Sequence, residues 1–534
     1  MNFLKEKLIH FILFLLFIFF LQGIFNLPVM DRDEARFATA SKTMMENKDF
    51  IDIKMQDEPR YKKPIGIYWF QSISNLAFGD EPYDSIWVYR LPSLCGIIFS
   101  LFLIFNFVRK IYGVKVSYLS LFFLILSLLT ISELHQAKTD ATLFFTITLC
   151  NLILLKGLNE GFVSKINKVV FWCSMGLGVL IKGPIIFIFT ILPLLILSLI
   201  KQKNFFNLVW SLSGLIIFSL ISIPWFVAIS IISNGLFWHE SVINDLFNKV
   251  KSGQESHGFP PGYYSLLLII MFWPGVIFIP NLLKKLYENW KKDFFEKNEL
   301  VFLCLWFFIP FITYEIIPTK LPHYIFPSYA ALSILISREV CNKNFGDFVT
   351  TTSFILLCLY PLILIVAKIF VVIEYSSIDF KLWIVVLTLL VLILSAIKTF
   401  FNKSFIGFVS ATIFFQSVVY LSAVYYLVPK LELIWVSEKI NSIIDEKIDT
   451  VDTVVHSGFN EPSLTFLTSH KAKKGNINDY FKSINSEKIL YIVTNPEEGL
   501  INEQNFSKVE LINEFNGFNY SQGKNILIKV YLIQ

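Results

Sequence analysis

The amino-acid sequence predicts an α-helical polytopic membrane protein of about 13 transmembrane helices, followed by a small α/β domain. Of its 534 residues, 55% are hydrophobic and only 16% are charged, whereas a soluble protein has about 25% charged residues. The apolar residues are gathered in runs close to the roughly 20 residues that a membrane helix needs. This composition excludes a disordered chain, a fibrous repeat and most soluble globular folds.

Thirteen apolar runs are candidate membrane spans. They lie near residues 8–27, 88–108, 116–132, 141–157, 169–181, 184–200, 207–233, 263–282, 300–317, 323–337, 349–373, 382–397 and 404–428. The runs at 169–181 and 323–337 are short, and a tilted or partly re-entrant path would suit them.

Positive charges alternate along these runs. Lys5 and Lys7 precede the first run, and the connections after every second run are cationic, whereas the other short connections carry single or mixed charges. Because cytoplasmic loops are rich in Lys and Arg, this pattern predicts a cytoplasmic N-terminus and an extracytoplasmic C-terminal part. The net charge of +5 is therefore a sign of topology, and no nucleic-acid partner is expected. The first run has no small-x-small cleavage site after it, which favours an uncleaved anchor over a signal peptide.

Two domains are expected. Residues 1–428 form the membrane domain, which includes a long outer loop at 28–87, and residues 429–534 form a soluble extracytoplasmic α/β domain. In the loop, residues 33–46 are typical of a short amphipathic helix, with Asp31 or Asp33 as its N-cap. This helix and the aromatic stretch that begins at Pro64 are expected to lie along the membrane surface.

The outer side collects the polar residues that need an explanation. Asp31, Asp33 and Glu34 place three carboxylates within four residues, which could hold a divalent cation or orient a hydroxyl or phosphate acceptor. The alternative is a helix N-terminus with favourable charges. Arg36 lies one turn after Asp33, as it would in a surface ion pair.

A second group of outer residues is cationic. The cluster Arg60 to Pro64 contains Lys63, which could bind a lipid phosphate or attract anionic lipid non-specifically. Lys182 and Lys320 lie on the outer side against the positive-inside trend, close to Asp140 and His323 in the predicted topology. Singly, each could be a helix cap or a lysine that reaches the interface, but together they favour an anion-binding cavity.

These residues, in this order, resemble the motifs of the bacterial lipid-carrier-dependent glycosyltransferases of the protein-mannosyltransferase and aminoarabinose-transferase (ArnT-like) superfamily, which have the GT-C type of fold. The motifs span nearly the whole chain. They are Asp33-Glu34-Ala35-Arg36-Phe37, Lys63-Pro64-Ile65-Gly66-Ile67-Tyr68-Trp69, Lys138-Thr139-Asp140, Lys182-Gly183-Pro184, Pro224-Trp225, His257 before Tyr263-Tyr264, Lys320-Leu321-Pro322-His323-Tyr324 and Glu461-Pro462-Ser463-Leu464.

The resemblance implies a glycosyltransferase that takes a sugar from a polyprenyl phosphate, undecaprenyl phosphate in bacteria, at the outer face of the inner membrane, with inversion at the anomeric carbon. It implies that Asp33, Glu34 and Asp140 are catalytic. It also implies that the carrier phosphate or the substrate is bound by Arg36, Lys63, Lys182, Lys320 and His323. The leading acceptor is lipid A, which would receive aminoarabinose; a polysaccharide or a protein is the alternative.

Two departures from the family pattern concern the cofactor and the sugar. Lys62 stands where the aminoarabinose transferases have an acidic residue that is a proposed metal ligand, so a divalent metal site with His257 is not supported. Phe37 replaces a tyrosine of the family motif and removes a hydroxyl. The cofactor, the sugar and the acceptor therefore remain open.

Two other classes of protein fit the sequence less well. A glycolipid flippase or transporter would carry charged residues at the bilayer midplane and on both faces, whereas the candidates here gather on one face. An envelope assembly or sensor protein would leave the clusters around Asp33 and Lys63 without a role.

Overall fold

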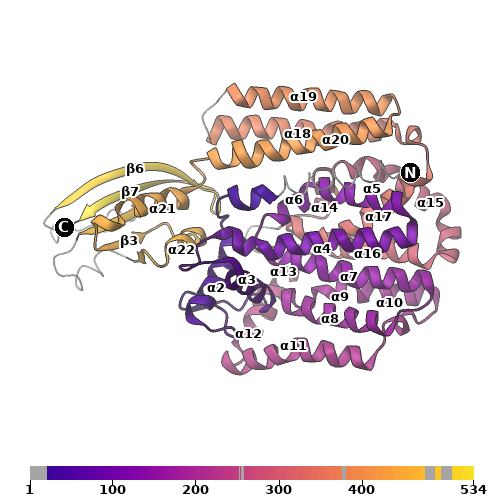
Figure 1. Ribbon diagram of the computed structural model, residues 1–534, viewed down its shortest axis with the longest axis horizontal. Helices are drawn as coiled ribbons and strands as arrows, with labels where there is room; N and C mark the ends of the chain where they lie inside the picture. Colours follow the sequence, from indigo (N-terminus) through magenta and orange to yellow (C-terminus); the bar gives the residue numbers. More distant parts are fainter. Residues whose placement is uncertain are drawn as a thin grey trace.

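The structure is a computed structural model that describes residues 21–251, 253, 258–375, 380–475, 488–494 and 508–533. In these residues, seven helices are long and apolar enough to cross a membrane. They lie side by side in one bundle (Figure 1). They are α4 (Ile86–Tyr112), α7 (Thr139–Glu160), α11 (Leu212–Ile232), α16 (Asn298–Ile316), α18 (Thr351–Tyr375), α19 (Phe380–Phe401) and α20 (Phe405–Ser422), which continues through η6 (Ala423–Leu427) and η7 (Val428–Lys430).

Two further candidate spans are sharply bent. The helices α5 (Val114–Leu126) and α6 (Leu128–Leu134) meet at 68°, and α14 (Tyr263–Met271) meets the pair η3 (Gly275–Phe278) and α15 (Ile279–Glu296) at 116°. The run predicted at 263–282 is therefore not one straight span. The chain turns at Pro274, which lacks the N–H that a helix interior requires. With these pairs counted, the described residues contain up to nine spans.

The other predicted runs are helical but shorter, broken or more charged. They form α8 (Lys165–Lys182), α9 (Ile185–Phe189), α10 (Ile191–Lys201), η4 (Pro322–Ser328) and α17 (Tyr329–Asn342). The run at 8–27 lies mostly outside the described residues, so the count of thirteen stays a prediction. Short connecting elements are η1 (Phe205–Leu208), α12 (Leu236–Trp238), η2 (His239–Phe247), α13 (Asn248–Lys251) and η5 (Phe345–Phe348).

The first long loop packs against protein on both sides. It contains α2 (Asp33–Asn47), the hairpin of β1 (Lys54–Met55) and β2 (Glu58–Pro59), and α3 (Gly66–Phe78). The predicted helix at 33–46 is confirmed, but every residue of α2 from Glu34 to Met45 except Arg36 is buried. The side chains of α2 therefore pack mainly on other parts of the protein, and the position of the loop along the membrane surface stays a prediction. The predicted cap is wrong, because Arg32 occupies the N-cap position without a side-chain cap.

The C-terminal part is the predicted small α/β unit. Its five-stranded sheet has the order β4-β3-β5-β7-β6, in which β3 pairs parallel to β4 and β5 while β7 pairs antiparallel to β5 and β6. Two helices pack on it through a core that includes Ile440, Leu464 and Leu490. The elements are α21 (Val436–Lys447), η8 (Ile448–Thr450), β3 (Thr453–Ser457), α22 (Pro462–Thr468), β4 (Lys473–Lys474), β5 (Ile489–Thr494), β6 (Val509–Asn519) and β7 (Lys524–Ile533).

Hydrogen bonds fasten this unit to the first loop, and α22 lies beside α2 (Figure 1). The backbone N–H of Asp31 donates to the Tyr520 hydroxyl over 2.6 Å, and the Asp31 carboxylate accepts from the N–H of Ser463 over 3.0 Å. The ammonium of Lys42 donates to the carbonyl of Phe466 over 3.0 Å. The first loop and the C-terminal part therefore lie on one side of the bundle, as the alternation of charges predicted.

A buried ion pair joins the loop to the bundle. The guanidinium of Arg90 on α4 donates to both carboxylate oxygens of Glu34 over 2.9 and 2.8 Å. Neither side chain is more than 1% exposed. The remaining Arg90 donors bind the carbonyls of Ile24, Leu27 and Pro28. Because a buried charge is tolerated only with partners, this network holds three segments together: α2, α4 and residues 24–28.

We expect Glu34→Ala to lower the thermal stability of the detergent-solubilised protein strongly. Loss of one member of a buried pair costs about 3–5 kcal/mol. The control is Glu160→Ala, which removes the exposed pair with Lys156 and should cost less than about 1 kcal/mol. Tryptophan fluorescence during heating measures both, and equal melting temperatures for the two variants would contradict the role given to Glu34.

Candidate active site

A cavity of about 720 Å³ lies between the bundle, α2, η2 and the segment that leads into α21. Apolar side chains form much of its wall, including Ile185 and Ile188 on α9, Leu246 and Tyr314. Its charged residues are eight cations and five carboxylates: Arg32, Arg36, Arg60, Lys62, Lys63, Lys138, Lys182 and Lys249, with Asp31, Asp33, Glu34, Asp140 and Asp245. An amphipathic molecule with an anionic head group suits such a lining.

Asp140 is a closely paired carboxylate in the cavity. It lies in the first turn of α7, where the helix dipole favours a negative charge. Its two oxygens face Lys182 at 2.5 Å and His323 at 3.8 Å. Lys182 ends α8 and His323 lies on η4, so side chains from two other elements meet this carboxylate of α7.

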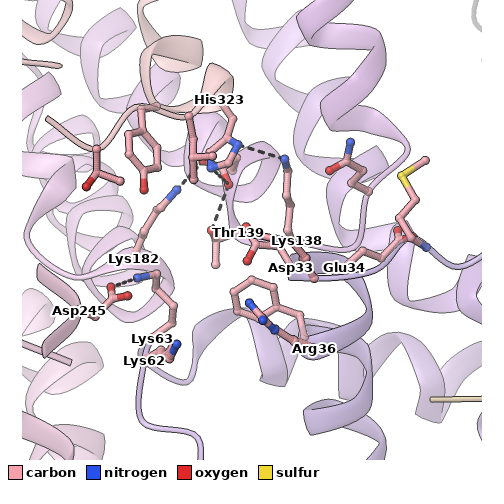
Figure 2. A pocket seen from close by; sticks show the side chains of 18 of the residues that line it. Asp33, Glu34, Arg36, Lys62, Lys63, Lys138, Thr139, Lys182, Asp245 and His323 are labelled. Atoms are coloured by element: carbon pink, nitrogen blue, oxygen red, sulfur yellow. Dashed lines mark hydrogen bonds and ion pairs between the residues drawn. The ribbon is translucent and has the colours of Figure 1, made fainter. Parts of the chain in front are cut away.

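Asp33 is the first residue of α2 and lies close to Lys138 (Figure 2). Burial alone would raise the pKa of the Asp33 carboxyl, but His323 and Lys138 lower it below its ordinary value. Lys138 pairs with Glu133 at 2.8 Å and lies 3.3 Å from the imidazole of His323. Asp33 is thus an ionised carboxylate at neutral pH, in reach of a molecule in the cavity.

Lys63 lies at a second cationic point, between the β1–β2 hairpin and α3. Its ammonium pairs with Asp245 of η2 (Figure 2). Asp245 also pairs with Lys249 at 2.6 Å. Burial lowers the pKa of Lys63 to about 8, against the opposing effect of Asp245. For Asp245, burial acts to raise the pKa, but Lys63 and Lys249 lower it overall.

Two of the predicted site residues are held by contacts within the protein. Lys320 does not line the cavity: its ammonium donates to the carbonyls of Tyr314, Glu315 and Ile317, and so caps the end of α16. Glu34 borders the cavity, but both of its oxygens are held by Arg90, and the N–H groups of Met30 and Ala137 donate to them as well. It orients its neighbours and has no oxygen left for a substrate.

A metal site finds no support in the residues that the structure describes. No group of three or more His, Cys, Asp or Glu side chains suitable for a metal occurs in the described part of the chain. His257 lies outside the described residues. Lys62 contributes a cation to the cavity where a metal ligand would be needed, so the residues present do not fit a divalent ion at that position.

Several cavity residues were not singled out from the sequence as site residues. In the sequence, Lys138 is only the first residue of the motif Lys138-Thr139-Asp140, and Arg60 is only one member of a cationic cluster. Neither has a predicted role of its own. Asp245 and Lys249 lie in the second outer segment (residues 234–262), where a charged residue in a polar stretch does not stand out. Tyr520 reaches the cavity from the C-terminal part, and nothing in the sequence indicates a contact across almost 500 residues.

Comparisons with known proteins show what this chain is similar to. A family described as dolichyl-phosphate-mannose-protein mannosyltransferase matches residues 62–226. The chain is 25% identical over 317 residues, 57% of its length, to the undecaprenyl phosphate-alpha-4-amino-4-deoxy-L-arabinose arabinosyl transferase 2 of Proteus mirabilis (strain HI4320), and it covers 54% of that protein. A similar transferase of Photorhabdus laumondii is 26% identical over 326 residues, 58% of the chain and 56% of the relative.

The similarity in fold covers a larger share of the chain than the similarity in sequence. A crystal structure of ArnT from Cupriavidus metallidurans bound to undecaprenyl phosphate superposes with a TM-score of 0.75. The match covers 98% of both chains at 14% sequence identity. The predicted GT-C fold is therefore confirmed, and the chain is a multi-pass membrane protein.

These findings confirm the resemblance to the ArnT-like, lipid-carrier-dependent GT-C glycosyltransferases. The chain spans little more than half the length of the two curated transferases.

Proposed function

We propose that this protein is a glycosyltransferase that moves a sugar from a polyprenyl phosphate carrier, undecaprenyl phosphate in bacteria, to an acceptor at the outer leaflet. The observation that carries the proposal is one cavity with a surplus of cations, two carboxylates on separate helices and an apolar wall. A phosphate head and a prenyl chain match these two kinds of surface. The names of the curated relatives support the same donor.

The reaction would be a single displacement. The acceptor oxygen forms a bond to the anomeric carbon, and the bond from that carbon to the phosphate oxygen breaks with its electron pair. Lys63 and Lys182 offset the charge that develops on the leaving phosphate. Asp33 orients the acceptor group and takes up its proton if this group is a hydroxyl. One displacement inverts the anomeric configuration.

The proposed roles differ among the other cavity residues. Asp140 holds Lys182 in place through their 2.5 Å pair, and its second oxygen is directed towards the sugar or the acceptor. Arg36 and His323 line the cavity and contact the substrate. Glu34 and Lys320 are positioning residues, for the reasons given above.

The leading specific case is the transfer of aminoarabinose to lipid A, because the relatives with this name match more than half of the chain. A protein or polysaccharide acceptor is the alternative, since the matching family is described as a protein mannosyltransferase. Mass spectrometry of lipid A and of envelope glycans from a deletion strain separates the two. Loss of aminoarabinose from lipid A supports the first, and an altered glycan with unchanged lipid A supports the second.

A transporter of lipid-linked sugars is not favoured. The charged cavity residues come from the ends of helices and from the first and second outer segments, whereas a transport path needs polar residues at the midplane.

Asp33→Asn should lower transfer by about 100-fold or more, because the neutral amide cannot take up a proton. The assay follows a labelled sugar from its undecaprenyl phosphate carrier to lipid A. Carrier binding should be retained. Glu46→Gln is the matched control, since it lies on the exposed far end of the same helix. Full transfer by the Asp33 variant would remove this residue from the mechanism.

Carrier binding should weaken above pH 8. Lys63 has a pKa near 8, so it is charged below that pH and loses its charge as the pH rises through it. The phosphate ester, whose second ionisation is near pH 6, does not change in this range. The affinity for undecaprenyl phosphate should fall by up to about tenfold per pH unit. Lys63→Arg should remove this decline, and an unchanged decline in that variant would exclude Lys63 as its cause.

We also propose an inner-membrane location in which the N-terminus is cytoplasmic and the C-terminal part is periplasmic. In His470→Cys, the new thiol at this exposed position should react with an impermeant maleimide added from the periplasmic side. The native Cys341, also exposed, should react only after the membrane is opened. The reverse pattern would invert the topology.

A further inference from the structure

One carboxylate bridges two lysines inside the cavity. Asp245 pairs through one oxygen with Lys63 and through the other with Lys249, the latter at 2.6 Å. The side chain of Asp245 is only 11% exposed, against 19% for Lys63 and 27% for Lys249. Two ammonium groups thus converge on one anion in a largely buried place, which is the arrangement of an anion-binding site with its anion present.

The anion present belongs to the chain itself. A carboxylate and a phosphate ester both offer oxygens that accept hydrogen bonds from two ammonium groups. If a phosphate entered between Lys63 and Lys249, it would lie against the Asp245 carboxylate, and like charges at that distance repel. The two anions therefore compete for the same pair of lysines.

The segment that carries Asp245 and Lys249 is suited to a shift. Residues 239–247 form a π-helix, a rare conformation that is frequent at functional sites. No residue of η2 or α13 is fully buried, so fewer packing contacts oppose a movement than in the bundle. Leu246 and Val250, on the same segment, line the cavity beside the two charged residues.

We propose that Asp245 holds the place of the carrier phosphate in the free protein, and that Lys249 binds this phosphate together with Lys63 once Asp245 is displaced. The ligand is a phosphate ester on a prenyl chain, so the inference rests on the proposed function. It adds a second phosphate-binding residue and an internal competitor that sets the affinity for the carrier.

The first test removes the competitor. In full-length protein in detergent at about pH 6.5, where Lys63 is protonated, Asp245→Asn should bind undecaprenyl phosphate about tenfold more tightly than the unaltered protein. Binding of undecaprenol, which lacks the phosphate, should not change. Glu240→Gln makes the same chemical change on the same π-helix outside the cavity, and should have no effect. Unchanged or weaker carrier binding by Asp245→Asn would overturn the proposal, the weaker result being expected if Asp245 only anchors the segment.

The second test concerns Lys249. Lys249→Gln should weaken binding of undecaprenyl phosphate about tenfold, Lys249→Arg should restore it, and Lys251→Gln on the exposed side of α13 should leave it unchanged. Normal binding by Lys249→Gln would remove Lys249 from the site. If the unaltered protein binds undecaprenyl phosphate no better than undecaprenol, the proposed function itself fails. If it binds the phosphate selectively and the Asp245 and Lys249 variants do not differ from it, only this inference fails.

Discussion

The geometry of the site depends on the buried pair of Arg90 and Glu34. Arg90 projects from a membrane helix, and the carboxylate that it holds lies next to Asp33 in the sequence. The same carboxylate accepts from the N–H of Ala137 over 2.8 Å, three residues before Asp140. One ion pair therefore fixes the starts of α2 and α7, which carry Asp33 and Asp140 in the cavity wall. A shift of either helix would leave a charge without its partner in an apolar surrounding, which is strongly unfavourable.

The cavity has more cations than carboxylates, and most of its described charges are held in pairs in the free protein. Asp140 pairs with Lys182, Glu133 pairs with Lys138, and Asp245 pairs with Lys63 and Lys249. Such pairing reduces the cost of burying these groups before a ligand arrives. It also means that an anionic ligand does not enter a vacant positive site. The ligand anion has to replace a carboxylate beside each lysine. The free energy of binding therefore depends on the cost of separating each ion pair.

The sequence was informative where a general physical rule applied. Alternating positive charges placed Asp33, Lys63 and His323 on one side, and the cavity contains all three. The roles of neighbouring residues could not be separated in this way, because Glu34 is distinguished from Asp33 only by a partner 56 residues away. Lys320 differs from Lys182 because α16 ends just before it and presents free carbonyls. Asp245 was missed, because one acidic residue in a polar segment has no distinguishing pattern.

The bond between Asp31 and Tyr520 has a consequence for biosynthesis. Tyr520 forms part of the cavity wall, although 489 positions separate it from its partner. When every membrane helix has been synthesised and inserted, the cavity therefore still lacks the part of its wall that Tyr520 forms. Under the proposed topology, the wall closes only when the last part of the chain has been exported, has folded and has docked onto α2. The site would thus be complete only after the C-terminal part has been exported. A chain that is still being synthesised would not yet use its sugar donor.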